Sequence, residues 1–387
     1  MASGEFDLVI AGAGIVGCTV AERAAAERGW RSLILERRPH IGGNCFDSAH
    51  ASGVIVHRYG PHYFRTDSQE VYDYLSRFTA WIPGNYVAKV ATRGELFDFP
   101  VNLNTLEQFY RTTLTPDSAR QLLDDVRDRT IRTPRNSEEL VLSRLGRDLY
   151  EAFYLGYTHK QWGVPPAALD PSVCGRIPVR FTRDASYVEQ RHQVMPRDGF
   201  SAMFARMLVS PSIEVRLGCD YAALRADLRP RIATLYTGPI DQYFDHRLGR
   251  LPWRSLDFEL VAYDEEWRQP CVQINYPDEH AYTRSVEYKH VTGQRHPHTV
   301  VGFEYSRASG DPYYPIPTPD SRRRYAAYRE LAAHERRTRR VYFAGRLATY
   351  SYLNMDQATA AALATFAEIE SDWLGHTGAT RRAASRA

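Results

Sequence analysis

Three glycines near the amino-terminus, Gly12, Gly14 and Gly17, carry the clearest chemical signal in the sequence. Their spacing, G-x-G-x-x-G, is typical of a loop that binds the pyrophosphate of a dinucleotide. The first glycine permits a tight turn, the second lets the backbone approach the pyrophosphate, and the third lets helix and strand pack closely. A helix beginning at this loop would add free N–H groups and the positive end of its dipole. Glu36 follows roughly 20 residues later, where a carboxylate can bind a ribose hydroxyl.

A second glycine-rich turn indicates which dinucleotide to expect. Glu36 argues against NADP, whose 2′-phosphate favours an arginine, although Arg37 and Arg38 follow directly. The turn PHIGGN at 39–44 then adds Gly43 and Asn44 beside the expected pyrophosphate. This longer glycine-rich path resembles the FAD-binding amino-terminus of the amine oxidase and mutase flavoproteins. The predicted cofactor is therefore FAD.

The remaining chemistry lies in short blocks dense in aromatic residues and arginines. The sequence shows no G-x-S-x-G elbow, no metal-ligand spacing and no obligatory pair of carboxylates. Aromatic faces stack on bases and sugars, and arginine forks bind phosphates, so such blocks should hold a nucleotide diphosphate beside the flavin. The alternative is that the tyrosines are core and interface residues. The blocks are YGPHYFRT (59–66), FPVNL (99–103), YEAFYLGYTHKQWG (150–163), GRIPVRF (175–181), YTGPIDQYF (236–244), AYTRSVEYKH (281–290), DPYYPIP (311–317) and AGRLATYSYLNMDQATAAAL (344–363).

The elements that must position these residues predict an α/β fold. A buried strand at 7–11, a helix at 18–28 and a strand at 31–35 form a Rossmann-type start, and helix signals beginning at Asn104, Thr115 and Ser137 follow. We expect a Rossmann-type FAD-binding domain interrupted by a helical insertion and an antiparallel-sheet substrate domain, closed by a strand at 340–343 and a helix at 354–373. The expected boundaries are 1–80 with 205–240 and 337–376 for FAD, 104–172 for the insertion with a mobile loop at about 165–178, 81–103 with 179–204 and 241–336 for the antiparallel sheet, and 377–387 for a flexible tail.

Composition excludes several other classes of protein. The net charge of +3 comes without a basic stripe, so we expect no nucleic-acid partner. Five cysteines without a C-x-x-C pair fit free thiols in a reducing cytoplasm rather than a zinc site. No apolar run approaches the roughly 18 residues of a membrane span, and no signal peptide precedes the first strand. We therefore expect a cytoplasmic protein without membrane insertion or metal.

The blocks GYTHKQWG, YTGPIDQYF, PYYPI and TYSYLNMD occur in an order that resembles the UDP-galactopyranose mutase family. The resemblance covers residues 5 to 375 and implies an isomerase that interconverts nucleotide-bound pyranose and furanose sugars. It implies FAD that is active when reduced, by NAD(P)H or a chemical reductant. In that mechanism flavin N5 attacks the anomeric carbon and displaces the diphosphate, the ring opens and recloses, and the net reaction is redox-neutral.

The resemblance also assigns roles to individual residues, each at a position that matches a family motif. The catalytic set it implies is Arg176 and Arg284 on the diphosphate with His62 beside the flavin. Arg346 and Asp356 would join the cofactor-binding residues. The substrate-binding residues it implies are Tyr187, Tyr314 and Tyr352 on the diphosphate, Phe153, Tyr157 and Trp162 on uracil and ribose, and Asn275 on the nucleotide side.

Three positions depart from the family pattern and bear on the sugar. Arg65 stands where histidine is frequent, Ala88 replaces a polar residue that would contact the sugar, and Tyr288 replaces a variable residue. A lost polar contact usually changes which sugar is accepted. UDP-galactose stays the default substrate, and UDP-N-acetylgalactosamine and a dTDP-fucose type sugar are the alternatives.

Two rival functions and one structural question stay open at this point. A flavin oxidase of the amine oxidase type would share the amino-terminal fold but would form hydrogen peroxide or NADH. A catalytically inactive nucleotide-sugar binding protein would fail to retain flavin. The resemblance is also compatible with a homodimer, which the sequence does not test.

Overall fold

A five-stranded parallel sheet forms the centre of the dinucleotide-binding part of the protein. The computed structural model describes residues 5–278 and 280–384, with 377–384 as backbone alone. The strand order is β10-β2-β1-β11-β17, and every neighbouring pair is parallel. All residues of β1 and β2 are buried, as a central parallel strand requires. This topology confirms the predicted α/β fold, with strands at Leu8–Ala11 (β1), Ser32–Glu36 (β2), Ile213–Leu217 (β10), Ala233–Tyr236 (β11) and Val341–Phe343 (β17).

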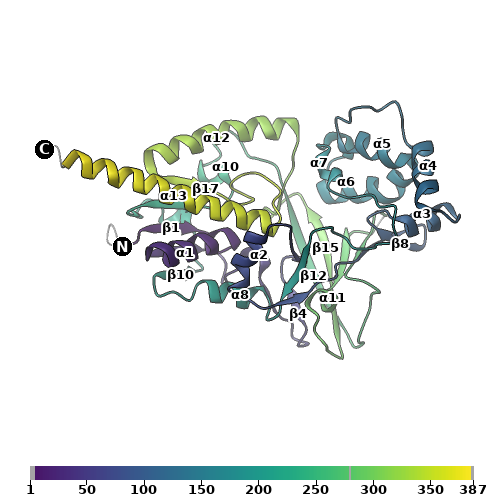
Figure 1. Cartoon of the computed structure of the whole chain (residues 1–387), viewed down its shortest axis with the longest axis horizontal. Helices are drawn as coiled ribbons and strands as arrows, with labels where there is room; N and C mark the ends of the chain where they lie inside the picture. Colours follow the sequence, from purple (N-terminus) through teal and green to yellow (C-terminus); the bar gives the residue numbers. More distant parts are fainter. Residues whose placement is uncertain (1–4, 279, 385–387) are drawn as a thin grey trace.

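Two helices pack against each other along this sheet. Helix α1 (Ile15–Arg28) is rich in alanine, so α13 (Met355–Ala384) approaches it closely along much of its length (Figure 1). Ala21, Ala24 and Ala362 are fully buried between them. Helix α13 continues past the end predicted at Trp373 and includes part of the segment 377–387, which was expected to be a flexible tail. Residues 385–387 of that segment lie outside the described residues.

The second sheet has seven strands and is antiparallel except for one pair. Its order is β16-β12-β15-β14-β13-β7-β8, and β13 pairs with β7 in parallel. The hairpin predicted around Gly94 is confirmed as β7 and β8. The bounds are Ala88–Thr92 (β7), Glu95–Phe99 (β8), Trp253–Tyr263 (β12), Gln273–Asn275 (β13), Arg284–Glu287 (β14), Thr299–Arg307 (β15) and Tyr314–Pro315 (β16).

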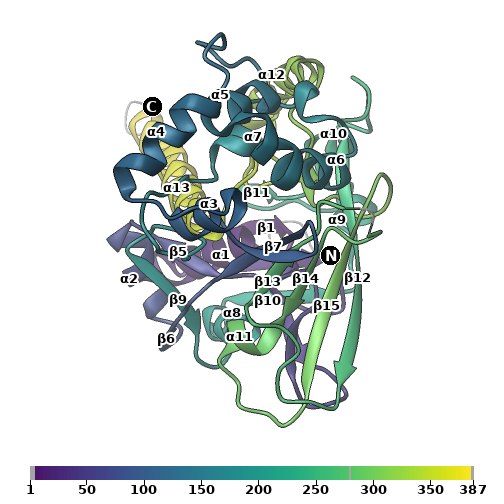
Figure 2. The same ribbon diagram turned by 90° about the vertical axis from the view of Figure 1, so that its right-hand side faces the viewer.

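The helical insertion lies beyond one end of this sheet, as Figure 2 shows. Its first helix begins two residues earlier than predicted, because Asn102 rather than Asn104 is the cap and accepts from the Thr105 N–H. Thr115 caps the second helix as predicted. The bounds are Leu103–Tyr110 (α3), Pro116–Val126 (α4), Ser137–Leu149 (α5), a π-helical turn at Tyr150–Leu155 (η2), Gly156–Trp162 (α6), Pro166–Ala168 (η3) and Ser172–Gly175 (α7).

The remaining elements connect the two sheets and shift two of the predicted boundaries. Residues 192–196 (β9) form a separate three-stranded sheet with β5 and β6 rather than joining the large sheet. Helix α12 (Pro319–Arg339) packs on β17, although its residues fall within the predicted antiparallel domain. Its sequence is mostly charged, so the apolar periodicity that marks a helix is weak. The bounds are Asp47–Ala49 (β3), Ile55–His57 (β4), Phe64–Thr66 (β5), Gln69–Ser76 (α2), Trp81–Pro83 (β6), His192–Pro196 (β9), Phe200–Met207 (α8), Tyr221–Leu224 (α9), Ile240–Tyr243 (α10), Tyr288–Thr292 (α11) and Gly43–Cys45 (η1).

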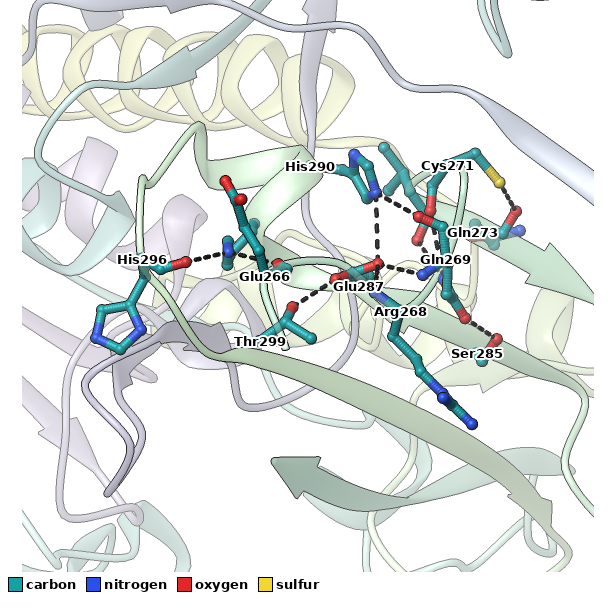
Figure 3. Close-up of polar contacts among 12 residues, drawn as sticks. Glu266, Arg268, Gln269, Cys271, Gln273, Ser285, Glu287, His290, His296 and Thr299 are labelled. Carbon is teal, nitrogen blue, oxygen red and sulfur yellow. Dashed lines mark hydrogen bonds and ion pairs between the residues drawn. The ribbon is translucent and has the colours of Figure 1, made fainter. Parts of the chain in front are cut away.

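A buried carboxylate holds the loops beside β14 in place. Glu287 is fully buried, and it accepts hydrogen bonds from the backbone N–H groups of Arg268 and Gln269 and from the Thr299 hydroxyl (Figure 3). Burial alone would raise the pKa of Glu287, but these hydrogen bonds and the one from His290 lower it. Glu287 therefore ties the backbone at Arg268 and Gln269 to β14, and it also bonds Thr299 on β15.

Candidate active site

The glycine loop lies at the carboxyl edge of the parallel sheet, between β1 and α1. A Cβ on Gly12 would lie 2.3 Å from Thr237 Oγ1, and one on Gly17 would lie 2.0 Å from the Gly12 carbonyl oxygen. A Cβ on Gly14 would meet only the Cα of Gly43, at 3.9 Å. Gly12 and Gly17 are therefore required by the protein's own packing, whereas Gly14 leaves room for a ligand. Gly14 is also the N-cap of α1 and makes no side-chain cap bond, which leaves the helix N–H groups for an anion.

The acidic residue after β2 organises this loop. Glu36 is buried, and its two carboxylate oxygens accept from the N–H groups of Ala13, at 2.8 Å, and Arg38, at 2.9 Å. The Arg38 side chain donates to Asn44 Oδ1 and stacks on the ring of Tyr59. The binding of Glu36 to a ribose hydroxyl stays a prediction. The side chain of Arg38 is engaged with protein groups.

One large cavity begins beside Asn44 and crosses the molecule to the helical insertion. Its volume is about 960 Å³. Among the residues that the structure describes, six arginines and a single carboxylate, Glu189, line it. Such an excess of fixed positive charge favours a polyanionic ligand. The arginines are Arg65, Arg144, Arg176, Arg284, Arg322 and Arg346.

Two of these arginines converge on one tyrosine. The guanidinium of Arg176 lies 4.2 Å from the ring centroid of Tyr352, and that of Arg346 lies 4.9 Å from it. Tyr352 in turn stacks on Tyr314, with 5.5 Å between centroids. Desolvation would raise the pKa of Tyr352, but the charges of Arg176, Arg346 and Arg284 outweigh it and lower the pKa below its ordinary value. These three residues, Arg176, Arg284 and Arg346, form an arginine cluster around Tyr352, and the cluster is a site of strong positive potential.

The loop predicted to be mobile carries Arg176 to this cluster. Arg176 follows α7, and Val173 and Leu169 of the same loop pack against Trp162. Asp170 forms an ion pair of 2.8 Å with Arg322 on α12. The loop is thus held to both the helical insertion and α12, with its arginine over the cavity.

Arg284 is held differently, by a carboxylate that the sequence did not reveal. Its guanidinium pairs with Glu304 at 2.8 Å, and Glu304 is fully buried. The two residues are direct partners in the register of β14 and β15. The signal that could have revealed Glu304 is an acidic residue opposite Arg284 in a paired strand. The register of these two strands was not known from the sequence. Glu304 fixes the direction of Arg284 while Arg284 still lines the cavity.

The predicted base-binding residues line the part of the cavity that the helical insertion forms. Phe153 comes from the π-helical turn, and Tyr157 and Trp162 come from α6, so one local helical segment presents all three. Asn275 and Tyr187 also line the cavity. The structure therefore brings the predicted substrate residues together, with the exception of Ala88.

Ala88 is a correction to the predicted site. It is fully buried in β7, where its register partners are Phe99 and Gln273, and it does not line the cavity. Tyr288, the third departure from the family pattern, is also fully buried and does not line it. Neither side chain reaches a ligand in this cavity, so of the three departures only Arg65 faces it.

The remaining cofactor residues lie beside the glycine-loop end of the cavity. His62 lines the wall, and burial together with His57 lowers its pKa to about 3, so it is neutral at physiological pH. Arg346 donates to the carbonyl of Leu353 and faces the cavity. Asp356, near the start of α13, has a buried Oδ1 without a hydrogen-bond partner in the described chain. This orphaned acceptor and the free space at Gly14 fit a bound dinucleotide.

The described residues form neither a metal-binding cluster nor a membrane-spanning helix. No group of three or more histidine, cysteine, aspartate or glutamate side chains there is arranged to hold a metal ion. Within the same residues, no helix is both long and apolar enough to cross a membrane.

Comparison with known proteins places this geometry in a family. Residues 152–352 match the sequence profile of UDP-galactopyranose mutase, and residues 10–78 match that of an NAD(P)-binding Rossmann-like domain. The chain is 38% identical over 365 residues to a probable UDP-galactopyranose mutase of Klebsiella pneumoniae, covering 93% of each chain. It belongs to the UDP-galactopyranose mutase family. It is also 37% identical over 361 residues to a dTDP-fucopyranose mutase of Escherichia coli, covering 90% of this chain and 94% of that one.

Membership in the UDP-galactopyranose mutase family makes the chain a mutase, which is an isomerase. The crystal structure of a reduced UDP-galactopyranose mutase has the same fold, with a TM-score of 0.71 at 15% identity over 95% of this chain and 96% of that one. A putrescine oxidase shares the fold more distantly, with a TM-score of 0.55 at 12% identity, covering 95% of this chain and 99% of that one. The Rossmann-like domain and the flavoprotein family support FAD as the bound dinucleotide.

Proposed function

We propose that this chain is a flavin-dependent, redox-neutral mutase that interconverts the pyranose and furanose forms of a nucleotide-diphosphate sugar. UDP-galactopyranose and UDP-galactofuranose are the default pair. The excess of arginine on the cavity wall carries this assignment, since six arginines and one carboxylate are among the described residues that line the cavity. An amine oxidase would have no use for this charge, which suits a diphosphate instead.

The arginines stabilise the diphosphate as it leaves the anomeric carbon. Arg176 and Arg346 make no ion pair with a carboxylate in the described chain, so their charge is available to the ligand. Arg284 is pre-aligned by Glu304 and loses little conformational freedom when it binds. Tyr314 and Tyr352 stack on each other beside Arg346, and their hydroxyls can donate to phosphate oxygens.

The cofactor end of the cavity supports this chemistry by binding and orientation. Gly14 and the start of α1 would hold the FAD pyrophosphate, with Glu36 on the adenosine ribose. Arg346 and Asp356 would contact the cofactor near the cavity. FAD in its reduced form would supply the nucleophile that the anomeric carbon requires. Neutral His62 adds no charge beside it, and the loop carrying Arg176 limits access of water.

A second sugar is favoured by one specific observation. The chain is 37% identical to the dTDP-fucopyranose mutase and 38% identical to the probable UDP-galactopyranose mutase. Arg65, the one departure from the family pattern that lines the cavity, also bears on the choice of sugar. We therefore include dTDP-fucose and UDP-N-acetylgalactosamine as alternative substrates.

The test is a chromatographic assay of the FAD-loaded protein with UDP-galactose, UDP-N-acetylgalactosamine and dTDP-fucose, with and without dithionite. We expect one donor to give an isomer of equal mass only when the flavin is reduced. Hydrogen peroxide formation with net oxidation of a substrate would contradict the mutase and support the oxidase. A protein that binds these donors but never isomerises them would be a binding protein instead.

A further inference from the structure

A chain of buried side chains joins Arg284 to Asn275 through Gln273. Arg284 Nη1 donates to Gln273 Oε1 at 3.4 Å, and the Tyr86 hydroxyl donates to the same oxygen at 2.6 Å. Gln273 Nε2 donates to Asn275 Oδ1 at 2.7 Å. Gln273 and Asn275 are 1% and 3% exposed, and all four residues line the cavity. The chain therefore connects a predicted phosphate-binding arginine to a predicted nucleotide contact.

The direction of this chain is set by the arginine. A guanidinium has donors only, so the atom of Gln273 that faces Arg284 must be the amide oxygen. The Gln273 amide nitrogen then faces Asn275, which must present its own oxygen in return. The Asn275 Nδ2 is left as a donor, and no hydrogen bond ties it to another group in the described chain.

We propose that Gln273 is a positioning residue that holds Asn275 with its amide N–H₂ toward the ligand. The group recognised by Asn275 is then a hydrogen-bond acceptor, an oxygen of the nucleotide-diphosphate sugar. This inference rests on the proposed function for the identity of the ligand. It explains why a buried amide stands at position 273 in a strand whose neighbours are Cys271, Val272 and Ile274.

Two features of the structure hold Gln273 in place. Its register partner on β7 is Ala88, whose methyl group leaves room for the larger amide side chain on the same face of the sheet. Its backbone carbonyl accepts from Cys271 Sγ at 3.2 Å, beside the Glu287 network (Figure 3). The small residue at 88 is thereby accounted for by packing against Gln273.

The test is a double-mutant cycle on binding of UDP-galactose to the oxidised, FAD-loaded protein, followed by quenching of tryptophan fluorescence. Gln273→Met keeps the size of the side chain and removes its hydrogen bonds, so we expect affinity to fall about tenfold. Asn275→Leu removes the group that Gln273 positions. In the Asn275→Leu background, Gln273→Met should change the dissociation constant less than twofold. Steady-state assays of Gln273→Met should show a raised KM with kcat changed less than twofold.

Two outcomes would contradict the inference, and a third separates it from the proposed function. An equal loss of affinity from Gln273→Met in both backgrounds would contradict it, because Gln273 would then act without Asn275. Unchanged affinity in the single variant would contradict it as well. A parent protein that binds UDP-galactose without isomerising it would refute the mutase while the cycle still tests Gln273. The melting temperature and the flavin absorbance of each variant serve as controls for folding.

Discussion

The glycine loop and the arginine cluster are built by opposite means. The glycine loop and the second glycine-rich turn belong to one continuous segment, residues 12–44, and the ligand contacts proposed for them are backbone groups whose geometry the local sequence dictates. The arginine cluster takes Arg176, Arg284 and Arg346 from three distant segments and aims their side chains by cation–π contacts and a buried ion pair. The first region should therefore fail by steric exclusion of the cofactor, and the second by loss of charge without loss of the cofactor.

The largest effect should come from removing charge at the cluster. Arg284→Ala should lower kcat about 100- to 1,000-fold, since one preorganised group facing developing charge is worth roughly 3–4 kcal/mol. FAD should remain bound, because Arg284 lies outside the glycine loop. Turnover and the flavin spectrum of the purified variant measure the two effects, and Arg284→Lys, which keeps the charge but not the fork, is the matched control. Activity equal to the parent would remove Arg284 from the reaction.

The glycine loop offers a matched pair that separates folding from cofactor binding. Gly17→Ala should destabilise the protein by roughly 3 kcal/mol, because its Cβ would lie 2.0 Å from the Gly12 carbonyl oxygen. Gly14→Val should leave the melting temperature of the FAD-free protein nearly unchanged but abolish FAD binding, because its side chain would fill the space proposed for the pyrophosphate. Calorimetry and flavin absorbance distinguish the two. A yellow Gly14→Val protein would show that the loop is not the pyrophosphate site.

A buried histidine behind the cavity should give the protein an acid-sensitive stability. Burial lowers the pKa of His57 to about 4, below its unfolded value near 6.5. The unfolded chain takes up a proton below pH 6.5 while the folded chain does not, so stability falls as pH drops from 6.5 toward 4, by about 1.4 kcal/mol per unit. His57→Asn should reduce this slope by about one proton in denaturant titrations at each pH. The same substitution at exposed His334 should leave the slope unchanged, and an unchanged slope for His57→Asn would contradict the assignment.

The smallest effect concerns Tyr352, whose ring lies beside Arg176 and Arg346. The pKa of Tyr352 lies below its ordinary value, so its hydroxyl should ionise at a pH below about 10. The phenolate would repel a diphosphate, and UDP affinity should fall about threefold as pH rises through this pKa. Tyr352→Phe should remove that fall while binding slightly more weakly at neutral pH. An identical pH profile for parent and variant, in fluorescence titrations with UDP, would show that Tyr352 does not face the diphosphate.

The difference between the two regions also decides what the sequence could predict. The strand, glycines, helix and acid of the dinucleotide unit follow one another within 40 residues, so the loop and the parallel sheet could be predicted. Glu304 and Gln273 could not, because their importance depends on strand register, which pairs Glu304 with Arg284 and Gln273 with Ala88. The resemblance placed a ligand contact at position 88 where the structure has a buried methyl group. Helix α12 was not predicted because its sequence is mostly charged and its apolar residues show only a weak helical periodicity.

The most direct test of the central claim, that the arginine cluster binds a diphosphate, compares UDP with uridine. Both ligands share the base and ribose contacts, so their difference in affinity for the FAD-loaded protein measures the cluster alone. We predict that UDP binds at least 100-fold more tightly than uridine, roughly 2.7 kcal/mol, and that this advantage shrinks in Arg284→Ala. Equal affinities for UDP and uridine would contradict the assignment of the cavity to a nucleotide-diphosphate sugar.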